Sequence, residues 1–556
     1  MKTKLLGLLM FMAIQANAQY NFEQIDIWSG SSGSSPKYIS EFNGKLFFQA
    51  AELSPVLKKL YKSDGTIAGT EVVATNINGT ETYAPESLYE MNGELYFTAF
   101  VSGIGRELFK TDGTDAGTVL IKDIRTGSSN SMDFNSNDDN QLFVEYNNEL
   151  YFRTSTNSSI ELWKTDGTES GTVSVKNFED AQNGAPTFIS KSGKNVIGVV
   201  FDGLLYFYVN RNGNGELWKT DGTTENTVLV RSSLNNISDM TVYNNELYFS
   251  AEDETNGKGR ELWVTDGTFA GTTIKHDIFP NNLNPFFGFG SDPSYLTIFN
   301  NELYFSARSY NSENNQIIGD ELWKTDGTNA TLIKDIKPGN LEQGLNIPNF
   351  TIYNNELYFV ASDNSNSDYE LWKTNGTESG TVKVVSVTDT GESIQFLGAI
   401  NYANKLFYFD SQQLWVTDGT PAGTKPLSGS SEEILQTSSN SLFKYNNKLW
   451  FAGTKSGNGN ELTSLTDNAL SVNTLKNSLE VSVYPNPATS FIKIKSKSLD
   501  QEIQSVEVFN LLGKKVLHQK SKTFNTVLNT SSLSKGIYFI KLKTNSQQFT
   551  KKIIIE

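Results

Sequence analysis

The fold is decided by one stretch of eight residues, Glu161-Leu162-Trp163-Lys164-Thr165-Asp166-Gly167-Thr168. A degenerate ninth copy of this frame occupies residues 461–468, and seven further copies are centred on Asp64, Asp112, Asp221, Asp266, Asp326, Asn375 and Asp418. Successive copies lie 43 to 60 residues apart, and six of the eight tryptophans fall in the third position of the frame. A period near 50 residues predicts a repeat architecture in which each copy forms one supersecondary unit.

A second recurring element precedes each copy and reads Tyr243-Asn244-Asn245-Glu246-Leu247-Tyr248-Phe249. It returns at 299–305 and 353–359, with variants at 42–48, 91–97, 146–152, 201–207 and 445–451 and a looser form at 402–407. Asn-Asn between two β-rich runs predicts a two-residue hairpin turn, because asparagine tolerates a positive φ. Asp-Gly predicts a second turn in the tryptophan-containing frame.

Each repeat is therefore expected to contain four short strands, with large apolar residues on both faces of the second and third. A small sheet covered on both faces by similar neighbours is typical of a propeller blade. We expect an all-β chain: a β-propeller of eight or nine four-stranded blades, followed by a small C-terminal β-sandwich. Residues 25–30 resemble 122–127 and 334–339, so the N-terminal segment is expected to supply the fourth strand of the last blade. An open solenoid of the same sheets is the alternative.

Composition excludes several common functions. The chain carries 46 Lys and Arg against 62 Asp and Glu, a net charge of -16, which argues against nucleic-acid binding. Cysteine is absent, so disulfides, thiolate zinc sites and cysteine nucleophiles are excluded. The two histidines, His276 and His518, are too few and too far apart to suggest a histidine metal cage or a Ser-His-Asp triad.

The first 18 residues have the pattern of a secretory signal peptide, with two lysines, an apolar run and a small-residue cleavage site between Ala18 and Gln19. A signal anchor is the alternative. The apolar run of about ten residues is shorter than the roughly 20 that a membrane helix needs. Because no later segment approaches a membrane span, we expect a secreted protein or one on the outer cell surface.

The last 78 residues differ in charge, since residues 479–556 contain twelve lysines, no arginine and five acidic residues. Apolar residues alternate with lysine there, as in half-exposed strands. Their motifs include Tyr484-Pro485-Asn486-Pro487, Gly513-Lys514 and Gly536-Ile537-Tyr538. With its motifs in the expected order, this segment resembles the type A sorting domain of the Bacteroidota type IX secretion system.

That resemblance implies export by the type IX translocon and removal of the domain by a sortase-like protease, followed by release or surface attachment. Residues 36 to about 470 likewise resemble the ELWxxDGT repeats of secreted proteins from that phylum, although the last copy lacks Trp. We therefore expect a signal peptide at 1–18, a propeller at 19–470, a linker at 471–478 and a sorting domain at 479–556.

The repeated acids have a structural interpretation. Asp166 and its equivalents are expected to be turn residues, and Glu161 and its equivalents to be cross-strand partners of Lys164-type residues. No catalytic, cofactor-binding or metal-binding residue is assigned. A Ca²⁺ site formed by Asp133, Asp138 and Asp139 in one loop is the open alternative.

The longest interval between copies contains an aromatic loop with Phe286, Phe287 and Phe289, which is the expected ligand-binding site. Packing of these rings against the next blade is the competing interpretation. We expect a noncatalytic protein that recognises or adheres to extracellular glycans or proteins. The alternatives are a secreted carbohydrate-active enzyme, a glycosidase or lyase on the propeller scaffold, and a structural envelope component.

Overall fold

The computed structural model divides into two compact units, Tyr20–Thr466 and a unit that contains Asp467–Glu556. It describes residues 20–556 except 53, 74–75, 78–79, 133–139, 156–159, 179–184, 188, 192–193, 212, 254, 256–257, 281–289, 314–315, 340–342, 346–348, 364–367, 386–396, 411–412, 428–433, 437–441, 456, 469–480, 485, 497–502, 511–513, 524 and 545–547. The regular elements of this described part are strands, so the all-β prediction is confirmed. In the same residues, no helix has the length and apolar character to cross a membrane.

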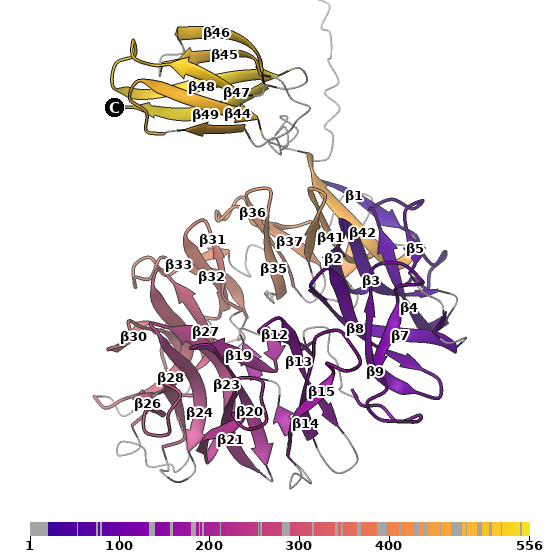
Figure 1. The fold of residues 1–556 in the computed structure, drawn as a ribbon. Coiled ribbons are helices and arrows are strands. Elements are labelled where there is room, and N and C mark those ends of the chain that lie inside the picture. Colours follow the sequence, from indigo (N-terminus) through magenta and orange to yellow (C-terminus); the bar gives the residue numbers. More distant parts are fainter. Residues whose placement is uncertain are drawn as a thin grey trace, which may run out of the picture. The chain divides into compact units, whose positions relative to one another are not determined.

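The described part of the first unit contains nine sheets that follow the repeat along the chain, which we number 1 to 9 (Figure 1). Sheet 1 contains β2 (Lys37–Phe42), β3 (Lys45–Glu52), β4 (Ser54–Ser63) and β5 (Glu71–Val72). Sheet 2 contains β6 (Asn76–Ile77), β7 (Thr80–Met91), β8 (Glu94–Val101), β9 (Gly105–Thr111) and β10 (Val119–Lys122). Sheet 3 contains β12 (Val144–Tyr146), β13 (Glu149–Ser155), β14 (Ile160–Thr165) and β15 (Val173–Asn177). Sheet 4 contains β16 (Ala185–Thr187), β19 (Gly198–Phe201), β20 (Leu204–Arg211), β21 (Asn214–Thr220) and β22 (Val228–Ser232).

The remaining sheets repeat this order. Sheet 5 contains β23 (Leu234–Tyr243), β24 (Glu246–Asp253), β25 (Arg260–Thr265) and β26 (Thr273–His276). Sheet 6 contains β27 (Ser294–Phe299), β28 (Glu302–Asn311), β29 (Gln316–Thr325) and β30 (Ala330–Lys334). Sheet 7 contains β31 (Thr351–Tyr353), β32 (Glu356–Ala361), β33 (Glu370–Thr374) and β34 (Val382–Val385). Sheet 8 contains β35 (Leu397–Tyr402), β36 (Lys405–Phe409), β37 (Leu414–Thr417) and β38 (Lys425–Pro426).

Sheet 9 draws on both ends of the first unit. It contains β39 (Ile434–Gln436), β40 (Phe443–Tyr445), β41 (Lys448–Lys455) and β42 (Gly459–Asp467), and β42 pairs with β1 (Tyr20–Ile25). The N-terminal segment therefore supplies the fourth strand of the last sheet, as expected. A separate small sheet consists of β11 (Asn140–Gln141), β17 (Ile189–Lys191) and β18 (Lys194–Val196).

The predicted hairpin turn joins the first and second strands of each sheet. Asn244 and Asn245 have φ angles of 48° and 64°, the left-handed pair that a two-residue turn matching the strand twist requires. The following Leu247, Tyr248 and Phe249 are fully buried. Both faces of the second strand are therefore covered, as the adjacent apolar residues predicted.

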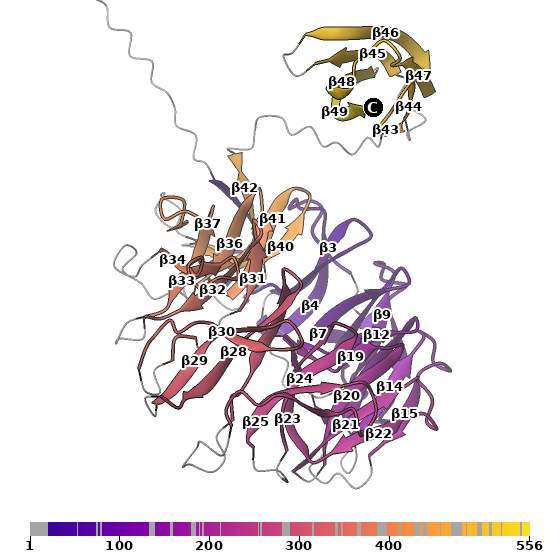
Figure 2. The same ribbon diagram turned by 90° about the vertical axis from the view of Figure 1, so that its left-hand side faces the viewer.

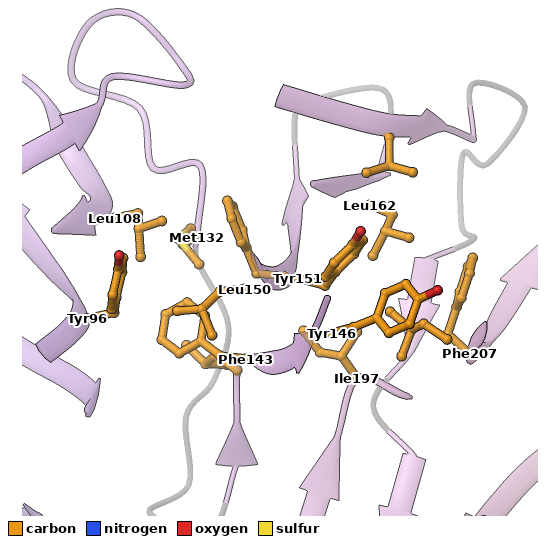
Figure 3. Packing of buried hydrophobic residues seen from close by; sticks show 14 of the residues in the cluster. Tyr96, Leu108, Met132, Phe143, Tyr146, Leu150, Tyr151, Leu162, Ile197 and Phe207 are labelled. Atoms are coloured by element: carbon orange, nitrogen blue, oxygen red, sulfur yellow. The ribbon is translucent and has the colours of Figure 1, made fainter. Parts of the chain in front are cut away.

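Each sheet packs against its neighbour along the chain through a shared hydrophobic cluster. Figure 3 shows one cluster, in which Tyr96 and Leu108 of sheet 2 and Tyr151 and Leu162 of sheet 3 lie with Phe207 of sheet 4. Dense apolar packing of this kind is the main favourable term in the stability of small sheets. Figure 2 gives a second view of the same sheets.

The last sheet of the first unit packs against the first sheet. Phe48 and Tyr61 of sheet 1 share a cluster with Tyr445 and Trp450 of sheet 9. The Tyr445 hydroxyl donates to the Gly44 carbonyl at 2.7 Å, a bond from one sheet to the hairpin turn of another. The same bond joins sheets 3 and 4, 5 and 6, 7 and 8, and 8 and 9, from Tyr146 to Gly203, Tyr243 to Asn301, Tyr353 to Asn404, and Tyr402 to Asn447. Sheets 9 and 1 are thus joined like sheets consecutive in sequence.

The second unit consists of two sheets around one core. One sheet contains β43 (Val481–Tyr484), β44 (Phe491–Ser496) and β47 (Asn525–Asn529). The other contains β45 (Ile503–Phe509), β46 (Lys515–Thr523), β48 (Gly536–Thr544) and β49 (Gln548–Ile555). Ile492 and Ile494 of the first sheet share a buried cluster with Val506, Ile540 and Ile553 of the second. This two-layer arrangement agrees with the predicted small sandwich.

Candidate functional site

The repeated aspartates are turn residues, as predicted. Asp166 Oδ1 accepts hydrogen bonds from the Thr168 backbone N–H at 2.8 Å and from the Thr168 hydroxyl at 2.7 Å. These bonds lower the pKa of the Asp166 carboxyl from its usual value. The Thr168 hydroxyl accepts from the Gly171 backbone N–H at 2.9 Å. Both side chains are thus committed to the local turn.

The glycine after this aspartate is required both by its backbone conformation and by a close contact with the preceding sheet. Gly167 has a φ of 89°, and a Cβ there would lie 2.2 Å from the Tyr96 hydroxyl of the preceding sheet. The turn therefore needs glycine both for its backbone conformation and for the close approach of a neighbouring sheet. Tyr151 and Tyr206 approach Gly222 and Gly267 in the same way.

The prediction for the repeated glutamates is wrong. Lys164 forms its ion pair with Glu149 of the second strand at 3.0 Å, whereas Glu161 accepts from the Trp163 indole N–H at 2.8 Å. The strand register places Glu161 opposite Thr154 and Lys164 opposite Tyr151, so the two side chains are not cross-strand neighbours.

In sheets 2, 5, 6 and 9 the equivalent glutamate is buried and holds the linker that follows the fourth strand. Glu321 accepts from the backbone N–H groups of Ile336 at 2.8 Å and Gly344 at 2.9 Å. Glu261 accepts from the N–H groups of Ile278 and Ser291, both at 3.0 Å. Glu107 and Glu461 make equivalent bonds. The glutamate of the third strand thus fixes the linker that leads to the next sheet. The sequence of the linker does not reveal this partner.

Burial raises the pKa of these glutamates, although the N–H donors act in the opposite direction. The pKa is about 7 for Glu107 and Glu261 and about 8 for Glu321, and it is also raised for Glu461. A raised carboxyl pKa suits a general acid. However, all four side chains are fully buried. Their contacts give them a structural role.

One position of the repeat is exposed in every sheet and was missed by the sequence analysis. It lies on the first strand, immediately before the residue that precedes the hairpin turn, and pairs with the leucine of the second strand. We call these nine residues the inner column: Glu41, Glu90, Glu145, Val200, Val242, Ile298, Ile352, Asn401 and Lys444. The sequence signal that could have identified this position is that its residue type varies between copies, whereas the positions that follow it in the repeat are nearly constant.

Neighbouring members of the inner column lie close together. The Asn401 side-chain amide of sheet 8 donates to the Ile352 carbonyl of sheet 7 at 3.1 Å. The Tyr89 hydroxyl, adjacent to Glu90 in sheet 2, donates to Glu145 Oε2 of sheet 3 at 3.4 Å. Members of the column are therefore in contact between sheets 7 and 8, and a residue beside the column reaches it between sheets 2 and 3.

The predicted binding residues lie outside the described part of the chain. These are the aromatic loop of Phe286, Phe287 and Phe289, the acidic loop of Asp133, Asp138 and Asp139, and the cleavage site at Ala18 and Gln19. Among the described residues, no group of three or more His, Cys, Asp or Glu side chains could hold a metal ion.

The described residues of the C-terminal motifs stabilise turns of the second unit. Asn486 Oδ1 accepts from the Ile554 backbone N–H at 2.8 Å, which ties the Asn-Pro loop to β49. The Tyr538 hydroxyl donates to the Ser534 carbonyl at 2.9 Å across the turn before β48, where Gly536 is the first residue. The Lys514 backbone N–H donates to Asn510 Oδ1 at 2.9 Å between β45 and β46. Pro487 follows in the Asn-Pro loop and Tyr484 ends β43, whereas Pro485 and Gly513 lie outside the described residues.

A comparison with protein families identifies this unit. Residues 482–556 match the secretion system C-terminal sorting domain. The sorting domain implies a protein exported by the type IX secretion system, at the cell surface or released from it. Within the sorting domain, the quoted motifs therefore have a structural role that the hydrogen bonds above explain.

Comparisons with whole proteins add little. No curated protein matches the chain. Solved structures that are similar include the extracellular domain of a protein described as a one-component system from B. thetaiotaomicron, at 11% identity and a TM-score of 0.24 over 94% of this chain and 87% of that one. Oligopeptidase B from Leishmania major is 9% identical, with a TM-score of 0.32 over 85% of this chain and 54% of that one. Prolyl oligopeptidase B from Galerina marginata is 11% identical, with a TM-score of 0.34 over 63% and 51%. At these TM-scores the likenesses carry no argument about function.

Proposed function

We propose that the nine sheets form a closed nine-bladed β-propeller that recognises extracellular glycans or proteins without catalysing a reaction. Support for closure comes from the shared cluster of sheets 9 and 1 and from the Tyr445–Gly44 bond, which repeats the bond between consecutive sheets. The N-terminal strand β1 would lock the ring, because it completes the sheet that contains the last repeat strands.

The observation that carries the recognition role is the division of labour among the repeated residues. Aspartates such as Asp166 are committed to turns, glutamates such as Glu321 to linkers, and lysines such as Lys164 to ion pairs. The exposed inner column is a first-strand position that changes from sheet to sheet. Binding residues on a rigid scaffold are expected at such variable surface positions rather than at positions that the scaffold itself uses.

The sorting domain supports delivery to the outside of the cell. We infer that the translocon of the type IX system and a sortase-like protease act on it, and that the propeller is the part that functions after delivery. The resemblance of the frame to ELWxxDGT repeats agrees with a secreted protein. The signal peptide at residues 1–18 would provide the first export step.

The test is to apply the full chain to arrays of bacterial and host glycans and of peptides, and to measure the release of reducing sugar from every glycan that binds. Binding without turnover is the expected result. Turnover of any glycan would instead establish the carbohydrate-active enzyme. A chain that binds nothing on either array would favour the structural envelope component and contradict recognition.

Closure of the ring has its own test. Deleting residues 20–25 removes β1, and we expect the melting temperature of the whole first unit to fall, because sheets 9 and 1 lose their common support. Differential scanning calorimetry of the full chain measures this, with the transition of the sorting domain as the internal reference. An open solenoid would instead lose only the end of its last sheet, and the main transition would stay in place.

A further inference from the structure

The inner column differs from the rest of the repeat in being ordered by chemical type along the chain. Sheets 1 to 3 carry glutamate, sheets 4 to 7 carry valine or isoleucine, and sheets 8 and 9 carry asparagine and lysine. The four aliphatic side chains are 37% to 44% exposed, in four successive sheets: Val200, Val242, Ile298 and Ile352. Single exposed aliphatic residues are ordinary, whereas aliphatic residues on strands that contact one another form an apolar patch of the kind that binds a partner.

The first strands that carry this column are neighbours of one another. First strands are in contact between sheets 3 and 4 (β12 and β19), 4 and 5 (β19 and β23), 5 and 6 (β23 and β27), 7 and 8 (β31 and β35), and 9 and 1 (β40 and β2). The Thr241 hydroxyl of β23 donates to the Leu296 carbonyl of β27 at 3.4 Å. In a closed ring, strands that meet in this way form the inner edge, so the column would line it.

The chemistry of the column selects a class of ligand. We propose that it binds a polypeptide segment that combines aliphatic with Lys or Arg side chains, a proposal that rests on the recognition role above. Aliphatic side chains would be buried against the arc from Val200 to Ile352, and cationic side chains would face Glu41, Glu90 and Glu145. The nine positions contain no aromatic residue, so this surface lacks the flat rings on which sugars stack.

The charge of the chain supports a basic partner. The total is -16, and residues 479–556 contribute twelve lysines and five acidic residues, so the remainder carries about -23. A field of this sign raises the local concentration of cations and speeds their association. The same field disfavours acidic peptides and anionic glycans.

The test uses the full chain and three labelled synthetic dodecapeptides, of alternating Lys-Leu, Glu-Leu and Lys-Ser, with Kd measured by fluorescence anisotropy. We expect the Lys-Leu peptide to bind tightest, because only it offers both aliphatic side chains to the valines and isoleucines of the column and cationic side chains to its glutamates. The triple variant V242S/I298S/I352S should weaken its binding by about tenfold or more. The double variant E41Q/E90Q should weaken it less, and added salt should reduce that difference.

A matched control lies on the fourth strands, where Val119, Val173 and Val228 are 38% to 40% exposed. The variant V119S/V173S/V228S removes three exposed aliphatic side chains from positions outside the column, two methylene groups fewer than the column variant, and its Kd should stay within about twofold of the parent. Equal losses from both triple variants, or no preference for the Lys-Leu peptide, would overturn the proposal. If glycans bind the full chain while this peptide does not, recognition stands and the peptide class is wrong.

Discussion

Most repeat glutamates on the third strands and the inner-column glutamates on the first strands have opposite environments, because the former are buried and the latter are exposed. Glu321 on a third strand is fully buried and accepts backbone N–H groups, whereas Glu90 on a first strand is exposed. The third-strand position keeps its glutamate in seven of the nine copies, with Lys59 and Gln413 in the other two, while the first-strand position changes its chemical type along the chain. In a repeat protein, constancy here reflects the needs of the scaffold, and ordered variation at an exposed position indicates function.

The difference follows from where each strand lies in its sheet. A third strand has neighbours on both edges, and its side chains face the adjacent sheets, so a polar residue there must find internal partners. A first strand forms an edge, except in sheet 2, where β6 pairs with β7, and the residue two positions before the hairpin turn points to solvent.

The largest effect is expected from E321A. Removing this carboxyl group leaves the N–H groups of Ile336 and Gly344 buried without an acceptor, at a cost of about 3 kcal/mol in the free energy of unfolding. Urea unfolding of the full chain measures it. E378A, in an exposed turn, is the matched control and should change stability by less than about 0.5 kcal/mol. Equal effects would show that the buried glutamates do not hold the linkers.

A smaller loss is expected from G222A. A Cβ at this position would lie 2.2 Å from the Tyr151 hydroxyl, in addition to the strain of a φ of 94°, so we expect a cost of about 2 kcal/mol. G203A separates the two causes, because that glycine has a φ of 71° but no atom within 4 Å of its added Cβ. If thermal melting shifts equally in both variants, backbone strain alone explains the glycine.

Stability should also depend on pH through the buried glutamates. Their folded pKa of about 7 to 8 exceeds the usual value of 4.5, so the folded state retains protons that the unfolded state has released. Stability should therefore fall as pH rises from about 5 to 8, with a limiting slope of about 1.4 kcal/mol per pH unit for each group. Urea midpoints across this range test it. E321Q should reduce the slope of the unfolding free energy against pH. An unchanged slope would show that groups other than Glu321 cause the pH dependence.

The smallest effect on stability is expected in the inner column. V242S should change the free energy of unfolding by less than about 0.5 kcal/mol, because the side chain is already exposed. Its cross-strand partner provides the contrast, since L247A empties a fully buried site and should cost about 2 to 5 kcal/mol. A large loss from V242S would place the inner column in the scaffold and remove the reason to treat it as a binding surface.

Much of the scaffold was predictable because its signals are local. Asn-Asn and Asp-Gly turns and adjacent large apolar residues report backbone conformation and burial over a few residues, so the four strands of each repeat followed from them. The C-terminal motifs likewise predicted a sandwich that the family comparison identifies as a sorting domain. The partners of the buried glutamates were not predictable, because their donors lie in linkers elsewhere in the chain. Ile336 is 15 residues from Glu321, and Ser34 is 427 residues from Glu461.

The sequence by itself determined the repeat, its strands, its turns and the charge difference between the two units, since each of these depends on residues near one another in the chain. Tertiary structure alone decided which sheet packs against which, that Tyr445 joins the last repeat to Gly44 of the first, and that Glu321 is buried while Glu90 is exposed. Two glutamates look alike in a sequence. Their environments differ because burial depends on neighbours that folding brings together from distant parts of the chain.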